Sequence, residues 1–295
     1  MSLIDTHHHF VPDFYAQDTE EALTAVEEAG GDPSGWPTPP WSPEGSIASM
    51  ERNGTTKAIL SLTAPGAVIA PTDEKRRALA RKANEYAASK RDEDPKRWGF
   101  FAALPSLLDT EGTLAEIRYA LDVLKAEGVT FFTRYGPENK YLGHAEFKPI
   151  WEELNSRRAV IFIHPTHPAD TTRVNPFLPQ PVIDYPHETT RTAVDLIITN
   201  TMRSYPYCKV ILSHAGGTLP FLITRITTVS REAAATARVN GKTSEEILED
   251  FRSFYFDLAL SSSKAVLNLV LDIIPHDHLL YGKLLHMLHF VYSCH

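Results

Sequence analysis

Short apolar runs alternate with longer amphipathic segments along the chain. Between the runs, residues 73–90, 114–127 and 188–205 carry apolar side chains at helical spacing. Strands that alternate with helices form βα units around a parallel sheet. Eight such units predict an α/β fold of the (β/α)8, or TIM, barrel type, and a doubly wound open sheet is the alternative. The eight runs rich in β-branched and aromatic residues are 3–7, 58–62, 100–105, 128–134, 159–165, 210–214, 254–260 and 278–282.

One segment departs from this alternation. Residues 30–44, GGDPSGWPTPPWSPE, are rich in glycine, proline and tryptophan, a composition typical of a loop. We therefore expect a loop insertion at about residues 28–46 that forms a lid or rim over the active-site face. A chain of 295 residues is within the range of a single barrel domain, so residues 1–295 are expected to form one.

The composition excludes several classes of protein. Hydrophobic residues make up 43% of the chain and the net charge is −8, which indicates a globular protein and argues against a nucleic-acid partner. Two cysteines cannot build a disulfide framework and fit a reducing compartment. No apolar run approaches the roughly 20 residues that span a bilayer, and residues 1–5 are not a signal peptide. We therefore predict a soluble cytoplasmic protein without a membrane segment.

Histidines follow the predicted strands. The chain begins MSLIDTHHHF, and because side chains alternate along a strand, His7 and His9 face one way and His8 the other. His164 and His214 end the fifth and sixth runs. The carboxyl ends of barrel strands meet at one mouth, and three protein ligands plus an open position are typical of catalytic zinc. We predict that His7, His9 and His164 bind Zn²⁺, with Mn²⁺ as an alternative; the other possibility is unrelated surface or core histidines.

Four further polar residues lie at or near predicted element ends. Arg134 ends the fourth run, where a planar guanidinium suits a substrate carboxylate, although a structural salt bridge is equally compatible. His187 and Glu188 open a predicted helix, where Glu188 would favour the positive end and His187 would contact the substrate or support the site. Asp257 lies near a strand end in the seventh run, where a buried acid bonded to the backbone is the alternative to a functional role.

These motifs together resemble a known family. A first-strand D-x-H-x-H, the mid-chain IFIHPTHP and the later ILSHAGGTLP are similar to the amidohydrolase-2 family, which includes aminocarboxymuconate-semialdehyde decarboxylase and related decarboxylases. The segments GGDPSGW, GVTFFTRYG, YLGHAEFKPIW and DYPHET resemble the fungal 6-methylsalicylate decarboxylases within that family. The resemblance covers about residues 1–282.

The resemblance implies a barrel of the metal-dependent hydrolase type and a reaction. Members of this branch decarboxylate hydroxybenzoates with a metal and without an organic cofactor, and the fungal group converts 6-methylsalicylate to m-cresol in polyketide secondary metabolism. The partner would be a small aromatic carboxylic acid, and a homodimer is possible. Carried over by position, the metal ligands are His7, His9 and His164, and the catalytic or substrate-contacting residues are His214, Arg134 and His187.

The chain departs from the family at its C-terminal end. The family carries a further metal-binding aspartate after the eighth strand, in a pattern close to L-F-G-S-D. This chain has HLLYG followed by KLLHMLHFVYSCH, with Leu284 at the matching position and no acid after Asp277. We therefore expect an incomplete last βα unit and an atypical tail at residues 283–295, which we attribute to an unspliced or mispredicted gene end. Replacement of the acid by His286 or His289 is the alternative.

Two other functions compete with decarboxylation. A hydrolase of the same superfamily would attack a lactone or an amide with metal-bound hydroxide. The fourth run, GVTFFTR, has no lysine to bridge two metals, which disfavours a binuclear hydrolase and leaves a mononuclear one open. A truncated, inactive paralogue is the third possibility.

Overall fold

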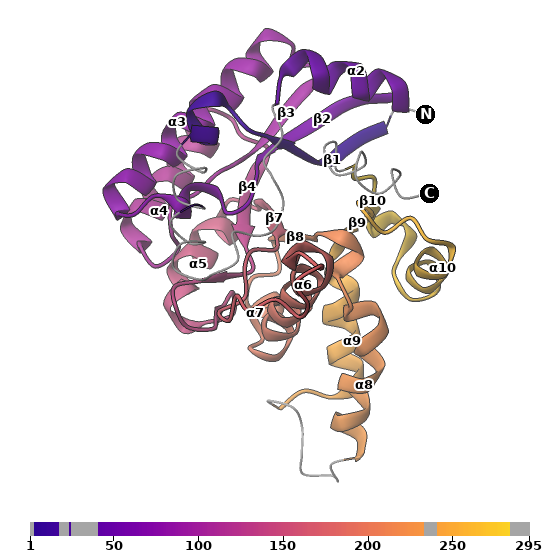
Figure 1. Ribbon diagram of the computed structural model, residues 1–295. Coiled ribbons are helices and arrows are strands. Elements are labelled where there is room, and N and C mark those ends of the chain that lie inside the picture. Colours follow the sequence, from indigo (N-terminus) through magenta and orange to yellow (C-terminus); the bar gives the residue numbers. More distant parts are fainter. Residues whose placement is uncertain (1–2, 18–23, 25–40, 233–240, 284–295) are drawn as a thin grey trace.

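The computed structural model describes residues 3–17, 24, 41–232 and 241–283 (Figure 1). Within these residues, eight strands form one sheet in the order β1-β2-β3-β4-β7-β8-β9-β10, and every neighbouring pair is parallel. Each strand therefore lies beside the strand that follows it around the sheet. Their bounds are Leu3–Phe10, Thr55–Leu62, Trp98–Ala102, Gly128–Phe132, Val160–His164, Lys209–Leu212, Tyr255–Asp257 and Leu279–Leu280.

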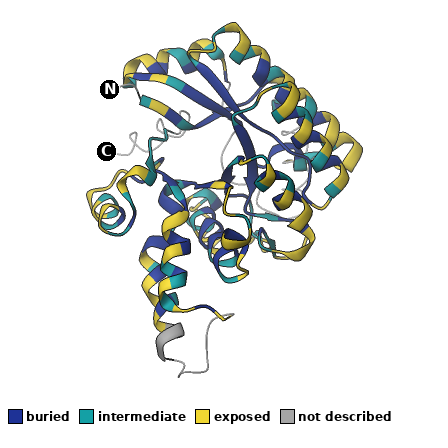
Figure 2. Ribbon diagram, turned by 180° about the vertical axis from the view of Figure 1, so that it is seen from behind, coloured by how far each residue is buried: buried dark blue, intermediate teal, exposed yellow. Residues whose placement is uncertain are grey.

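Helices return the chain between the strands and cover the outside of the sheet. In Figure 2 their buried faces turn towards the strands and their exposed faces turn away. The described helices α2 to α10 are Pro43–Asn53, Asp73–Glu93, Thr110–Arg118, Lys148–Ser156, Gln180–Ile198, Thr201–Ser204, Leu219–Glu232, Ser244–Ser253 and Lys264–Ile273. A short hairpin, β5 (Arg134–Tyr135) with β6 (Lys140–Tyr141), follows β4.

The first and eighth strands meet and bring the sheet close to closure. The backbone N–H of Thr6 donates to the carbonyl of Tyr281 at 3.0 Å, and the Thr6 hydroxyl donates to the same carbonyl at 3.0 Å. We call this junction the seam. A sheet whose strand order follows the chain and whose two edges meet is a barrel, so the predicted (β/α)8 fold is confirmed and the open doubly wound sheet is wrong.

The barrel interior is filled in layers. The lower layer is a cluster of four buried side chains, Ile59, Phe101, Phe162 and Ile211. Side chains alternate along β7, so Phe162 and His164 point inward while the neighbouring isoleucines join the larger core under the helices. Both faces of β7 are thus buried, which explains its continuous apolar sequence. The layer above Phe162 is made of histidines.

Several predicted boundaries differ from the structure. The helix expected at 188–205 begins at Gln180, so His187 and Glu188 lie in its middle, because α6 continues through Pro186. Proline usually ends or kinks a helix, so the sequence predicted the start of this helix after Pro186. The segment 114–127 is α4 followed by one π-helical turn, Tyr119–Val123.

Two sequence predictions fall largely outside the described residues. Of the loop insertion at 28–46, residues 43–46 form the first turn of α2, and residues 28–40 are not described. Of the tail, only Lys283 is described. Among the residues that the structure describes, no helix combines the length and apolar character that crossing a membrane requires.

Candidate metal centre

Three buried imidazoles converge at the carboxyl end of the barrel. His7 and His9 come from β1 and His164 from the end of β7, and all are at most 8% exposed. The Nε2 atom of His9 lies 3.2 Å from that of His7 and 3.1 Å from that of His164. Each ring offers one ligand atom within 4.8 Å of the other two. The structure thus brings together the three residues that the sequence predicts as ligands.

The second nitrogen of each ring, Nδ1, has a hydrogen-bond partner of its own. The Nδ1 atoms of His7 and His164 face acceptors, and that of His9 faces both the carbonyl and the hydroxyl of Ser61. When each Nδ1 donates its proton, the three Nε2 atoms present lone pairs to one another. Three lone pairs at this separation repel, and a divalent cation between them would turn that repulsion into coordination. The residues therefore fit a metal ion. The acceptors for His7, His9 and His164 are the Asp257 carboxylate at 3.0 Å, the Ser61 carbonyl at 3.4 Å and the Pro165 carbonyl at 2.8 Å.

Burial favours the neutral form of His9 and His164. It lowers the pKa of His9 and of His164 well below the usual value of 6.5, and neighbouring histidines lower both values further. Metal binding requires neutral imidazole, so the pocket favours the ligating form at neutral pH.

His214 lies beside the three rings. Its ring centre is 4.9 Å from that of His7 and 5.8 Å from that of His164. Burial lowers the pKa of His214 to about 3, and its buried Nε2 has no hydrogen-bond partner among the described residues. His214 has a φ of 55°, as does Ala215, in the left-handed region that non-glycine residues seldom adopt. A strained residue with an unpaired buried nitrogen is typical of a functional site.

Asp257, at the end of β9, supports His7 from behind. Its carboxylate bonds Nδ1 of His7 and accepts the N–H groups of His214 at 3.3 Å and Ala259 at 3.0 Å. Burial alone would raise the pKa of Asp257, but its charge interaction and hydrogen bond with His7 outweigh burial and lower it. A carboxylate behind a ligating imidazole orients the ring and increases its basicity. The sequence placed Asp257 at a strand end, but the link to His7 across 250 positions was not predicted.

Arg134 bonds the backbone. Its guanidinium donates to the carbonyls of His167 at 3.1 Å, Glu138 at 3.0 Å and Gly136, and burial lowers its pKa. Among the described residues it forms no salt bridge. Its Nε is buried and has no hydrogen-bond partner among the described residues. This N–H is therefore left to bond another group.

His187 is exposed on α6. Tyr185, two residues earlier, is 7% exposed, and its ring centre lies 6.4 Å from that of His164 and 6.1 Å from that of His167. Tyr185 therefore faces the site where the sequence suggested His187. Tyr185 is part of the DYPHET segment noted in the sequence. That Tyr185 and not His187 turns inward becomes visible only in the structure, where α6 continues through Pro186.

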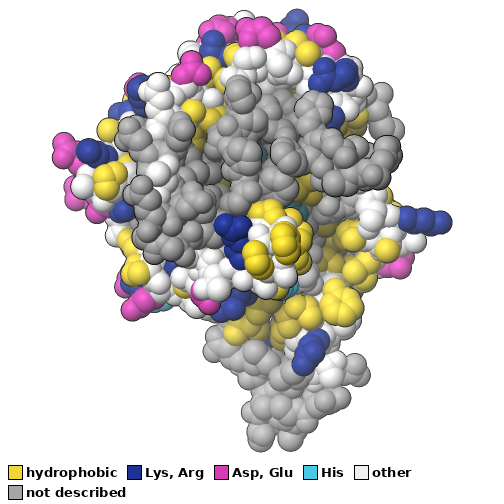
Figure 3. All heavy atoms as spheres, in the orientation of Figure 1, with side chains coloured by type: hydrophobic (Ala, Val, Ile, Leu, Met, Phe, Trp, Pro, Cys, Tyr) yellow, Lys and Arg dark blue, Asp and Glu magenta, His cyan; other side chains and the backbone are white. Residues whose placement is uncertain are grey.

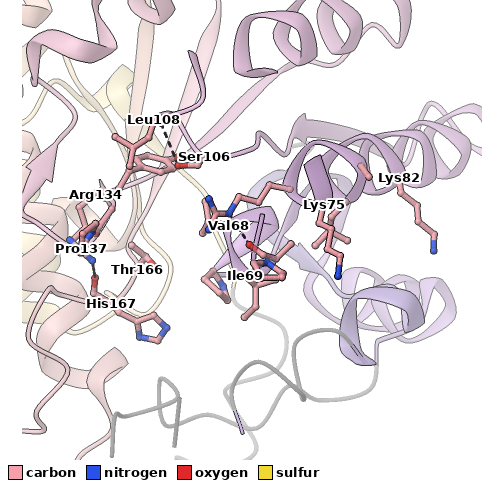
Figure 4. A pocket seen from close by; sticks show the side chains of 18 of the residues that line it. Val68, Ile69, Lys75, Lys82, Ser106, Leu108, Arg134, Pro137, Thr166 and His167 are labelled. Carbon is pink, nitrogen blue, oxygen red and sulfur yellow. Dashed lines mark hydrogen bonds between the residues drawn. The ribbon is translucent and has the colours of Figure 1, made fainter. Parts of the chain in front are cut away.

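A cavity of about 1140 Å³ lies beside the mouth, bounded by α3 and by the loops after β2, β3, β4 and β7. Figure 4 shows Arg134, Thr166 and His167 on one side and Lys75 and Lys82 of α3 on the other. The three ligand histidines do not line it. Its described lining includes four basic side chains and no acidic one, so it is suited to an anion.

The comparison with known proteins decides the family. Residues 4–282 match the amidohydrolase family. The chain belongs to that family. Residues 283–295 lie outside the match. The predicted resemblance is thereby confirmed.

Curated relatives of this amidohydrolase are decarboxylases. A 6-methylsalicylic acid decarboxylase of Penicillium expansum is 50% identical over 283 residues, which cover 96% of this chain and 84% of that protein. A second 6-methylsalicylic acid decarboxylase, from Aspergillus aculeatus, is 50% identical over 284 residues, which cover 95% of this chain and 83% of that protein. The predicted similarity to the fungal decarboxylases is confirmed.

Solved structures share the amidohydrolase barrel. A crystal structure of an amidohydrolase II has a TM-score of 0.83 at 29% identity and covers 95% of this chain and 86% of its own. A dihydroxybenzoic acid decarboxylase from Polaromonas, solved with bound manganese and the inhibitor 2-nitroresorcinol, has a TM-score of 0.79 at 22% identity, with 96% and 86% covered. The latter supports the fold alone.

Proposed function

We propose that this amidohydrolase is a metal-dependent, non-oxidative decarboxylase that converts 6-methylsalicylate, or a closely related hydroxybenzoate, to the corresponding phenol. The convergence of three imidazole Nε2 atoms on one point carries the proposal, in a chain 50% identical to 6-methylsalicylic acid decarboxylases. The reaction breaks the bond between the ring and the carboxylate, releases CO2 and adds a proton to the ring carbon.

The metal would be held by His7, His9 and His164. When bound, a divalent ion supplies a Lewis acid that orients the carboxylate and phenolic oxygens and stabilises their negative charge. Imidazole ligands accept Zn²⁺ and Mn²⁺ alike, and manganese is bound in the Polaromonas structure. Zinc, a homodimer and a cytoplasmic location remain predictions from the sequence.

His214 is the proposed proton-handling residue. Its Nε2 is buried without a hydrogen-bond partner among the described residues, and its ring centre lies 4.9 Å from that of His7. With a pKa lowered to about 3 by burial, the ring does not store a proton at neutral pH. It therefore holds a water or relays a proton to the ring carbon, a role of general acid–base catalysis.

The substrate is proposed to arrive from the basic cavity. Figure 3 shows that acidic side chains lie mainly towards the upper and left edges of the face in view, while hydrophobic ones gather near its centre and lower right. In the cavity, Arg134 donates to two carbonyls after β4, those of Gly136 and Glu138, and to that of His167 after β7. Its Nε, which has no partner among the described residues, is left for one further acceptor. Arg134 and Tyr185 are the proposed substrate contacts, and the contact from His187 stays a prediction.

The test is a product assay on purified protein of known metal content. Zn²⁺-loaded and Mn²⁺-loaded protein are incubated with 6-methylsalicylate, and m-cresol and CO2 are quantified together. Equimolar m-cresol and CO2, absent with a His164→Ala variant, support the proposal. Lactone or amide hydrolysis without CO2 would instead identify a hydrolase, and a protein that binds no metal and turns over neither substrate would be an inactive relative.

A further inference from the structure

Strand β1 contains a bulge next to the first metal ligand. Three residue steps of β1, from Asp5 to His8, span only two of β2, from Ala58 to Leu60. One extra residue in a strand leaves a backbone group without its ladder partner and redirects the side chains around it. His7 and His9 lie on the inward side of the strand, and across the bulge Asp5 contacts His8.

The Asp5 carboxylate accepts three donors at this point. Its Oδ1 accepts the N–H of His7 at 3.0 Å and the N–H of Lys283 at 2.9 Å, and its Oδ2 bonds Nδ1 of His8 at 3.0 Å. One side chain that is 2% exposed therefore joins the backbone of His7, a proposed metal ligand, to that of Lys283, three residues after β10, across the seam.

His8 continues this network away from the metal. Its Nε2 lies 3.0 Å from the hydroxyl of Ser46 on α2. Serine, histidine and aspartate in a row also form the catalytic array of serine hydrolases. Here the three side chains are at most 2% exposed, so no substrate reaches Ser46. A buried and fully bonded array of this kind rigidifies its surroundings.

The space around His7 leaves little tolerance for movement. A Cβ on Gly282 would lie 3.0 Å from both the Cβ of His7 and Oδ1 of Asp257. His7 is thus enclosed by the eighth strand on one side and bonded to Asp257 through its ring. Its backbone N–H donates to Asp5.

We propose that Asp5 is a positioning residue for the metal: it fixes the backbone of His7 and couples that ligand to closure of the barrel, without touching the metal itself. This inference rests on the metal-dependent function proposed above. A metal ligand displaced by a fraction of an ångström loses affinity, and removing partners of ligands typically costs about 10- to 100-fold.

The test compares Mn²⁺ affinity, by chelator competition, with the melting temperature of the metal-free protein. Asp5→Asn keeps the shape of the side chain but offers one acceptor oxygen to three donors. We expect it to bind Mn²⁺ about 10- to 100-fold more weakly than the wild type. If Asp5→Asn does not fold, Asp5→Ser, which retains a single hydroxyl acceptor, is measured in its place with the same expectation.

Two control variants separate positioning from general stability. Thr6→Val removes the hydroxyl bond to Tyr281 at the same seam, and Glu116→Gln perturbs a buried acid that bonds Arg81 and Asn84 of α3. Both should lower the melting temperature and leave Mn²⁺ affinity within about twofold. Unchanged affinity in the Asp5 variant, or an equal loss in Thr6→Val, would overturn the inference. Wild-type protein that binds no Mn²⁺ or Zn²⁺ would instead refute the proposed function.

Discussion

The two sides of strand β1 hold the same residue type in opposite chemical situations. His7 and His9 on the inner side and His8 on the outer side are all at most 8% exposed. His8 has both ring nitrogens bonded, to Asp5 and Ser46, whereas the inner pair has bonded Nδ1 atoms and Nε2 atoms that face other lone pairs. Burial therefore does not distinguish a metal ligand from a structural histidine; the bonding of its second nitrogen does.

Removing an inner histidine should have the largest effect. His7→Ala or His164→Ala leaves two of three ligands, so metal affinity should fall by more than the ~100-fold typical of losing an outer partner, and turnover should disappear with it. Metal content after dialysis, measured by atomic emission, checks this. A His7→Ala protein that keeps one tightly bound metal per chain would show that the inner and outer histidines of β1 do not differ in metal binding.

His214 should affect the reaction and spare the metal. His214→Gln removes the ring beside the ligands, and loss of a proton-transfer group commonly costs ~10²–10⁴-fold in rate. Because His214 is not one of the three ligands, metal stoichiometry should remain at the wild-type value. The readouts are kcat for CO2 release and bound metal in the same sample. Loss of both together would mean that His214 belongs with the ligands.

The inner site should make the metal-free protein sensitive to acid. Burial lowers the folded-state pKa of His9, His164 and His214, whereas the unfolded value is about 6.5. Below that pH the unfolded chain binds more protons, so this stability is present at neutral pH and is lost on acidification. The expected slope is at most about 1.4 kcal/mol per pH unit for each histidine.

Urea unfolding of metal-free protein at pH 7.5, 6.5 and 5.5 measures that slope. His164→Ala supplies the matched control, because it removes one of the three contributions and should flatten the curve. Identical pH dependence in the two proteins would show that burial does not lower the pKa of His164 in the folded protein.

The outer histidine should give the smallest effect on the metal. His8→Ala removes two buried hydrogen bonds and should lower stability by about 1–3 kcal/mol, but the three ligands remain. We expect one metal per chain, with at most a modest loss of affinity through Asp5. Calorimetric titration with Mn²⁺ and thermal unfolding check the two parts separately; a His8→Ala protein that folds and binds no metal would contradict the assignment.

The sequence was sufficient for the barrel and for the three histidines that the barrel brings together, because both depend on local patterns. Strand β7 is a continuous apolar run that ends in His164, His214 follows β8 by two residues, and alternation separates His8 from its neighbours. Long-range partners left no such signal: the bond from His7 to Asp257 and that from Asp5 to Lys283 arise only when the barrel closes.

Local exceptions account for the remaining differences. Pro186 lies inside α6, where proline normally marks an end, so Tyr185 rather than His187 turns to the site. The bulge in β1 contains no glycine, so the sequence does not predict it. Arg134 satisfies backbone carbonyls, a use of guanidinium that residue type alone does not distinguish from substrate binding.

The basic cavity has a kinetic consequence. The chain carries a net charge of −8, so an anionic acid is repelled at long range. At physiological ionic strength the Debye length is about 8 Å, so remote acidic residues are largely screened while nearby cations are felt. Encounter of the anion should therefore slow as salt is added, and kcat/KM, rather than kcat, should report it. The cations concerned are Lys75, Arg76, Lys82 and Arg134.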